Sequence, residues 1–221
     1  MNHTEAVEMM LKNLDHWRHL PKYQLERRAD VFFSLFIRQI VEQRVGVLSR
    51  LIIPEFPLRH NKKLTDTNHT VNVDYALFSE DCMYLVELKT DPDSYSWSQH
   101  RYLMKAVNVD KFEGIIDGIR RVIANTSEVK KKKYNILVQE LAKSGFVSAT
   151  DLKISKLPEV KTLYVGPRPS DTTLAHEIEE YRIDLLDVVN TLEDSVDEAE
   201  RLFAFYLRRW NDNPAGSICC E

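Results

Sequence analysis

The chain has 221 residues, of which 43% are hydrophobic and 29% are charged. This composition is typical of a soluble globular protein and excludes fibrous and disordered chains. Thirty Lys and Arg residues against 34 Asp and Glu residues give a net charge of −4, so contact with a nucleic acid would need a local basic patch or a bound cation.

The cysteines and the apolar runs bear on the cellular compartment. The chain has three cysteines, Cys82, Cys219 and Cys220. This odd number does not suit a disulfide framework, and the spacing does not fit a zinc site. No uncharged run approaches the ~18 residues of a membrane span, and charged residues among the first twelve do not fit a secretion signal. We therefore expect a cytoplasmic protein with no membrane contact.

The first half of the chain predicts two helices and three strands. Apolar residues at helical spacing predict a short helix over 1–20 and a long one over 25–50. An extended segment over 52–58 carries two prolines, which confine it to a sheet edge. Alternating residues then predict strands over 71–78 and 83–89, paired as an antiparallel hairpin.

The second half predicts mainly helices. Ser96 and Gln99 fit a capping box, which opens one long helix to Ala124. A helix over 129–143 and a buried strand over 162–165 follow. Residues 173–192 fit either one helix or a helix followed by a strand, and a second capping box at 195–198 opens a helix that extends to about residue 210.

This order of elements indicates an α/β fold, in which helices flank a mixed central sheet of four or five strands. We expect a single domain over residues 1–221. It would comprise an N-terminal helical extension (1–24), a core (25–166) and a C-terminal helical region (167–221).

Three charged residues on the predicted hairpin suggest chemistry. Asp74 lies in one strand, and Glu87 and Lys89 end the next on one face, because alternate residues of a strand point the same way. Pairing of the strands brings Asp74 next to Glu87. Two close carboxylates repel each other, and a hard cation such as Mg²⁺ relieves that repulsion. With Lys89 to position water, the trio suits metal-assisted phosphodiester hydrolysis.

The motif Val73-Asp74 followed by Glu87-Leu88-Lys89 resembles the PD-(D/E)XK nuclease superfamily, the restriction-endonuclease-like fold. The residue before the Asp is Val73, where the family name has proline. The resemblance covers residues 42–102, and the family order of helix, three strands, helix and strand extends to Val165.

The resemblance implies a restriction-endonuclease-like core and a nuclease that cuts DNA with Mg²⁺ or Mn²⁺. Asp74, Glu87 and the Leu88 carbonyl would hold the metal, and Lys89 would activate or position water. A further acidic residue on the first core helix is expected at Glu42, with Glu55 as its rival.

Some branches of the family carry Gln and Tyr on the following helix, and Gln99 and Tyr102 resemble that pair. Arg59, Lys62 and Lys63 precede the Asp74 strand and are the expected phosphate contacts. A homodimer is a further expectation.

Simpler interpretations remain open for these residues. Asp74, Glu87 and Lys89 could form a cross-strand ion pair, and Glu42 could be an exposed helical charge. Gln99 could reach back to Ser96 within the capping box, and Tyr102 could be a core aromatic. The alternative function is a catalytically inactive or non-nuclease member of the fold that binds nucleic acid or protein. A third possibility is a helical interaction protein with a chance motif.

Overall fold

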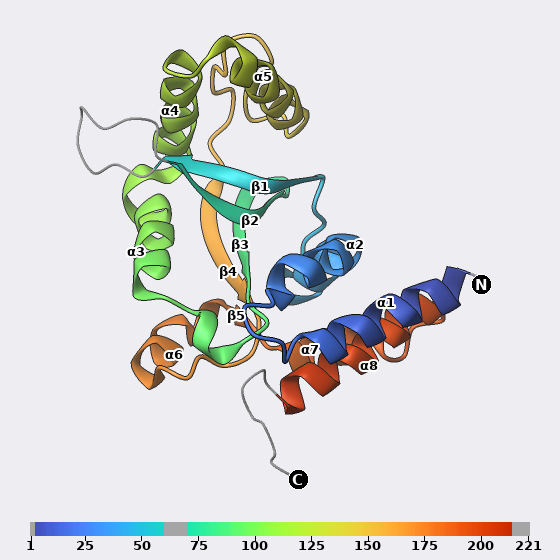
Figure 1. Cartoon of the computed structure of the whole chain (residues 1–221). Helices are drawn as coiled ribbons and strands as arrows, with labels where there is room; N and C mark the ends of the chain where they lie inside the picture. The colour runs from blue at the N-terminus through green and yellow to red at the C-terminus, as the bar shows by residue number, and fades with distance from the viewer. Residues whose placement is uncertain (1–2, 60–69, 214–221) are drawn as a thin grey trace. The chain divides into compact units, whose positions relative to one another are not determined.

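The computed structural model describes residues 3–59 and 70–213. Five strands form one sheet in the order β1-β2-β3-β4-β5, with helices before, between and after them in the sequence (Figure 1). β2 pairs antiparallel with both β1 and β3, whereas β4 and β5 pair parallel. The sheet is therefore mixed, and the predicted α/β class is confirmed.

The N-terminal strands follow the sequence prediction closely. They are β1 (Leu51–Arg59), β2 (Thr70–Phe78) and β3 (Cys82–Leu88). β1 carries both prolines and lies at the end of the strand order, as expected of a strand that lacks two N–H donors. β4 (Glu159–Val165) is longer than predicted, and β5 is the short strand Arg182–Ile183.

The chain forms two compact units that interleave along the sequence. We call residues 47–87 and 96–163 the sheet unit, because it contains most of the strands. Residues 1–46, 88–95 and 164–221 form the helical unit. The division into segments 1–24, 25–166 and 167–221 of a single domain stays a prediction.

In the sheet unit, the segment predicted as one helix from Ser96 to Ala124 is three elements. These are α3 (Trp97–Lys105), a π-helical turn (Ala106–Asp110) and α4 (Lys111–Ala124). The Lys105 ammonium lies 2.9 Å from the Asp110 carboxylate, and this spacing of five residues suits the wider π turn. The prediction was wrong because the apolar periodicity continues through the turn.

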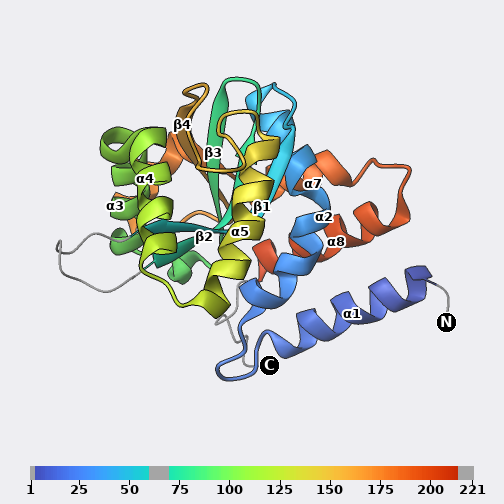
Figure 2. The same ribbon diagram turned by 90° about the horizontal axis from the view of Figure 1, so that it is seen from above.

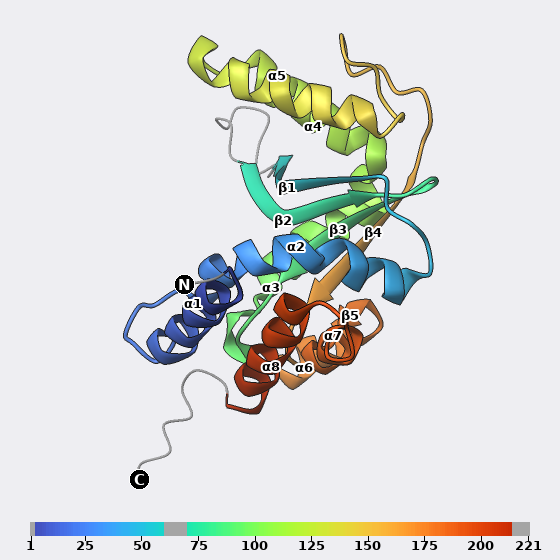
Figure 3. The same cartoon turned by 90° about the vertical axis from the view of Figure 1, so that its right-hand side faces the viewer.

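α5 (Glu128–Lys143) follows, and both α4 and α5 lie beside β1 (Figure 3). A chain of aromatic contacts runs through the core of this unit. It joins the rings of Phe56, Phe78, Phe146 and Phe112 at centroid separations of 5.9–6.5 Å. These buried rings fix the sheet against its helices.

The helical unit contains the two ends of the described chain. Its main helices are α1 (His3–Trp17), α2 (Leu25–Val45), α7 (Leu185–Leu192) and α8 (Glu198–Asp212). α1 lies alongside α8 (Figures 1 and 2), and the Arg209 guanidinium donates to Asp15 at 2.8 and 3.0 Å. Phe203 of α8 packs against three phenylalanines of α2.

Three boundaries in the helical unit differ from prediction. α2 ends at Val45 rather than at residue 50, because Gly46 adopts φ +71° and its N–H donates to the Glu42 carbonyl at 2.8 Å. Residues 173–192 form α6 (Thr172–Ile178), a 3₁₀ turn, β5 and α7. Asp197, not Ser195, caps α8, since its carboxylate accepts from two backbone N–H groups of the first turn.

Among the described helices, none is long and apolar enough to cross a membrane.

Candidate metal and active site

The register of β2 and β3 bears on the positions of Asp74 and Glu87. The paired residues run from Phe78 with Met83 to Tyr75 with Val86. The same register continued by one step would set Asp74 opposite Glu87, and opposite residues of an antiparallel pair share a face. Glu87 is only 3% exposed, whereas Asp74 is half-buried. The predicted juxtaposition of the two carboxylates lies one step beyond the last paired residues and stays a prediction.

Glu55 lies at the same level on β1. Pro54 pairs with Tyr75 and Phe56 pairs with Val73, so Glu55 falls opposite Asp74 between them. Its φ of +50° is the left-handed conformation, which is uncommon for a non-glycine residue. The exposed Glu55 carboxylate accepts a hydrogen bond from the Asn72 amide at 3.0 Å. Glu55, the alternative acidic residue predicted from the sequence, therefore lies on β1, the strand that pairs with the Asp74 strand β2.

Gln99 contacts the site directly. Ser96 caps α3 through its hydroxyl, which accepts from the Gln99 backbone N–H at 3.2 Å. The Gln99 side chain is directed to the β3 strand instead, where its Nε2–H donates to Glu87 Oε1. The first turn of α3 therefore holds the Glu87 carboxylate in place.

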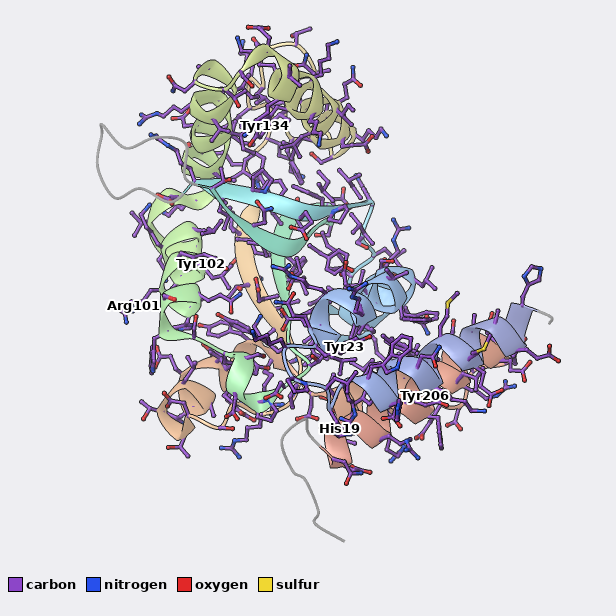
Figure 4. The ribbon with its side chains drawn as sticks, in the orientation of Figure 1. His19, Tyr23, Arg101, Tyr102, Tyr134 and Tyr206 are labelled. Atoms are coloured by element: carbon purple, nitrogen blue, oxygen red, sulfur yellow. The ribbon has the colours of Figure 1, made fainter. Side chains whose placement is uncertain are left out.

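Tyr102 lies one helical turn beyond Gln99 on α3 (Figure 4). Burial raises the pKa of its phenol, and the negative charges of Glu87 and Asp74 raise this pKa further, against a hydrogen bond with Gln99 that lowers it. Both carboxylates are therefore near enough to act on the same hydroxyl.

Lys89 follows the end of β3 and belongs to the helical unit. Its backbone N–H donates to the Val165 carbonyl at 2.8 Å, so it still pairs with β4. The side chain is buried, with Nζ 3.5 Å from the Glu26 carboxylate. Glu26 is in the first turn of α2 and was missed by sequence reasoning. Its only signal was an acidic residue at the start of a helix, which usually reflects the helix dipole.

The other predicted residues take different places. Glu42 is half-buried on α2 and belongs to the helical unit, whereas Asp74 and Glu87 belong to the sheet unit. Leu88 ends β3 with a buried side chain. Arg59 ends β1 and lines a cavity of the sheet unit. Lys62 and Lys63 lie outside the described residues.

The metal-ligand chemistry is limited to a pair of carboxylates. Within residues 3–59 and 70–213, no three His, Cys, Asp or Glu side chains are grouped closely enough to hold a metal ion together. Two carboxylates nevertheless suit Mg²⁺, which usually keeps several waters and takes one or two protein carboxylates. Asp74 and Glu87 are thus a candidate for an open magnesium site that carries water.

Comparisons with known proteins give no relative: no protein-family model, no curated protein and no solved structure matches the chain. The function is therefore argued from the residues and their geometry.

Proposed function

We propose that this protein is a divalent-metal-dependent nuclease that hydrolyses phosphodiester bonds of DNA. The observation that supports the proposal is the register of β2 and β3, which continued one step past Tyr75 and Val86 would set Asp74 opposite Glu87, together with the bond from Gln99 to Glu87 and the effect of both carboxylates on Tyr102. The restriction-endonuclease-like core and the substrate class come from the sequence resemblance.

The carboxylate pair supplies the affinity for a metal. Glu87 is almost fully buried, and placing a second negative charge opposite it is unfavourable unless a cation is shared. Asp74 and Glu87 would hold Mg²⁺ or Mn²⁺, with the Leu88 carbonyl as the expected third protein ligand. When bound, the ion would supply Lewis-acid stabilisation of the phosphate and a more acidic water.

Lys89 is the proposed positioning group for the attacking water. Two residues of chain span at most about 7 Å, so its Cα cannot be far from that of Glu87. Its ammonium has three donors to offer to water or to a phosphate oxygen. Glu26 would keep this buried lysine charged and oriented, which is the role we assign to the ion pair at 3.5 Å.

A second candidate function is binding without catalysis on the same fold. The observation in its favour is the engagement of Lys89 by Glu26, together with the lack of a three-ligand cluster among the described residues. In that case the ion pair would be structural only. The two functions differ in one measurable property, which is cleavage that depends on both the metal and Lys89.

The test is cleavage of single-stranded and double-stranded DNA with Mg²⁺ or Mn²⁺. We expect cleavage that a chelator abolishes and that Glu87→Gln and Lys89→Gln each reduce by about 100-fold or more. Lys89 is buried, so circular dichroism must show that each variant remains folded.

Glu80→Gln is the matched control, because Glu80 is an exposed acid in the β2–β3 turn and pairs only loosely with Arg50 at 3.3 Å. It should cleave as the wild type does. Cleavage that survives in folded Glu87→Gln, or no metal-dependent cleavage at all, would contradict the nuclease proposal. The second outcome would favour the binding function.

A further inference from the structure

A cavity of about 500 Å³ lies within the sheet unit. Its walls come from the ends of β1 and β2, from α3, from the π-helical turn and from α4. Its volume is within the usual range of ligand pockets. Nothing in the proposed nuclease chemistry assigns it a ligand.

The charges on the cavity wall favour an anion. Four basic residues line it, namely Arg59, Arg101, Lys105 and Arg121, against two acidic ones, Asp110 and Asp117. Both carboxylates are already neutralised.

Asp110 pairs with Lys105 at 2.9 Å, and Asp117 pairs with Arg120 at 2.5 Å. Within the described part of the chain, Arg59, Arg101 and Arg121 form no ion pair with an acidic side chain. The Arg101 Nε–H donates to the Trp97 carbonyl at 3.3 Å, and the other donors of the three guanidinium groups are left to bind an anion such as phosphate.

The backbone of α4 is adapted to hold one of these arginines. A Cβ added at Gly118 would lie 3.1 Å from the Arg59 Cβ, closer than most carbon contacts allow. Glycine at this position therefore lets the stem of Arg59 lie against α4. This contact places the Cβ of Arg59 against α4 at the wall of the cavity.

The rest of the wall suits a flat apolar group. Leu58, Val71 and Ile115 line it, and Tyr102 adds an aromatic ring. Aromatic rings stack on nucleobases without regard to their sequence. The apolar and aromatic wall of the cavity suits the base of a nucleotide, and the three arginines suit its phosphate.

We propose that this cavity binds a nucleoside monophosphate group, with the phosphate on Arg59, Arg101 and Arg121 and the base near Tyr102. Tyr102 lines the cavity and lies within electrostatic range of Asp74 and Glu87. A nucleotide bound near Tyr102 would therefore lie near these carboxylates. The same chemistry occurs in a free nucleotide and at the phosphorylated end of a strand. Only the assignment to a strand end rests on the proposed nuclease function.

The test is isothermal titration of the intact protein with deoxyadenosine monophosphate, in the presence of a chelator so that no metal takes part. We expect saturable binding that Arg101→Ala and Arg121→Ala each weaken by about tenfold or more, since each removes charge-assisted hydrogen bonds. Deoxyadenosine without phosphate should bind far more weakly.

Arg38→Ala is the matched control, because Arg38 is an exposed helical arginine of α2 outside the cavity. It should bind as the wild type does. The proposal is overturned if the wild type shows no saturable binding, if the two cavity variants bind unchanged, or if inorganic phosphate binds as tightly as the nucleotide.

A second arm separates the two sources of the ligand and keeps the two proposals distinguishable. Tighter binding of a 5′-phosphorylated than of a 5′-hydroxyl oligonucleotide assigns the cavity to a strand end, and equal binding assigns it to the free nucleotide. Glu87→Gln should retain nucleotide binding even where it abolishes cleavage. Failure of the nuclease proposal would therefore leave this result unaffected.

Discussion

At the scale of single residues, the site is defined by charges that are buried where few charges are tolerated. Glu87 and Lys89 are each 3% exposed and two residues apart. A buried charge is strongly unfavourable unless a partner or a cation compensates it. Gln99 donates to Glu87, and Glu26 lies 3.5 Å from Lys89, so both groups have their own support.

The environment of Tyr102 should affect the free energy of unfolding at high pH. Its pKa is raised by burial and by Glu87 and Asp74, whereas an unfolded tyrosine titrates near pH 10. The stability that un-ionised Tyr102 contributes to the folded state is therefore fully present below about pH 10, and it is lost as the pH rises toward the pKa of the folded protein. We predict that the free energy of unfolding falls above pH 10 and that Tyr102→Phe makes this fall shallower, by up to about 1.4 kcal/mol per pH unit.

Urea unfolding at pH 8, 10 and 11 measures this slope. Burial also raises the pKa of Tyr84, to about 12, so some slope should remain in the variant. A slope that is the same in Tyr102→Phe as in the wild type would show that the phenol does not feel the two carboxylates.

At the scale of elements, α3 connects the candidate metal site with the cavity. Its first turn supplies Gln99 to Glu87, and Tyr102, Arg101 and Lys105 line the cavity. The helix begins at Ser96, whose hydroxyl accepts from the Gln99 N–H. The start of α3 therefore sets the position of the residues on which both proposals depend.

Loss of this cap should be measurable. We predict that Ser96→Ala lowers the free energy of unfolding by about 1 kcal/mol, because a first-turn N–H loses its acceptor. The comparison is Ser127→Ala at the start of α5, where the serine makes no side-chain cap hydrogen bond. Chemical denaturation of the two variants should show the smaller loss for Ser127→Ala, and equal losses would mean that the Ser96 cap adds nothing.

The elements also show what sequence patterns can and cannot predict. The hairpin of β2 and β3 was predictable because alternation and a short turn are local properties. The π-helical turn was not, because the apolar periodicity runs through 106–110 while the ion pair between Lys105 and Asp110 favours a wider turn. The partner of the Gln99 side chain was equally hidden, since Gln99 Nε2–H donates to Glu87, a residue of another element.

At the scale of the whole molecule, the limit of sequence reasoning is contact between distant parts of the chain. Asp74 and Glu87 could be paired because one hairpin joins them. The contact between Lys89 and Glu26 could not be predicted, because the strands β1, β2 and β3 lie between these two residues in the sequence. Arg59 was named from the sequence as a phosphate contact, but Arg101 and Arg121 were missed for the same reason, since they come from other elements of the cavity wall and carry no motif.

The central claim is that Asp74 and Glu87 together bind one divalent metal ion, and binding of Mn²⁺ monitored by electron paramagnetic resonance tests it most directly. The account predicts saturable binding of one ion by the wild type, retained in Glu80→Gln and lost in both Asp74→Asn and Glu87→Gln. Equal Mn²⁺ binding by the wild type and by folded Glu87→Gln, or no saturable binding by the wild type, would contradict it.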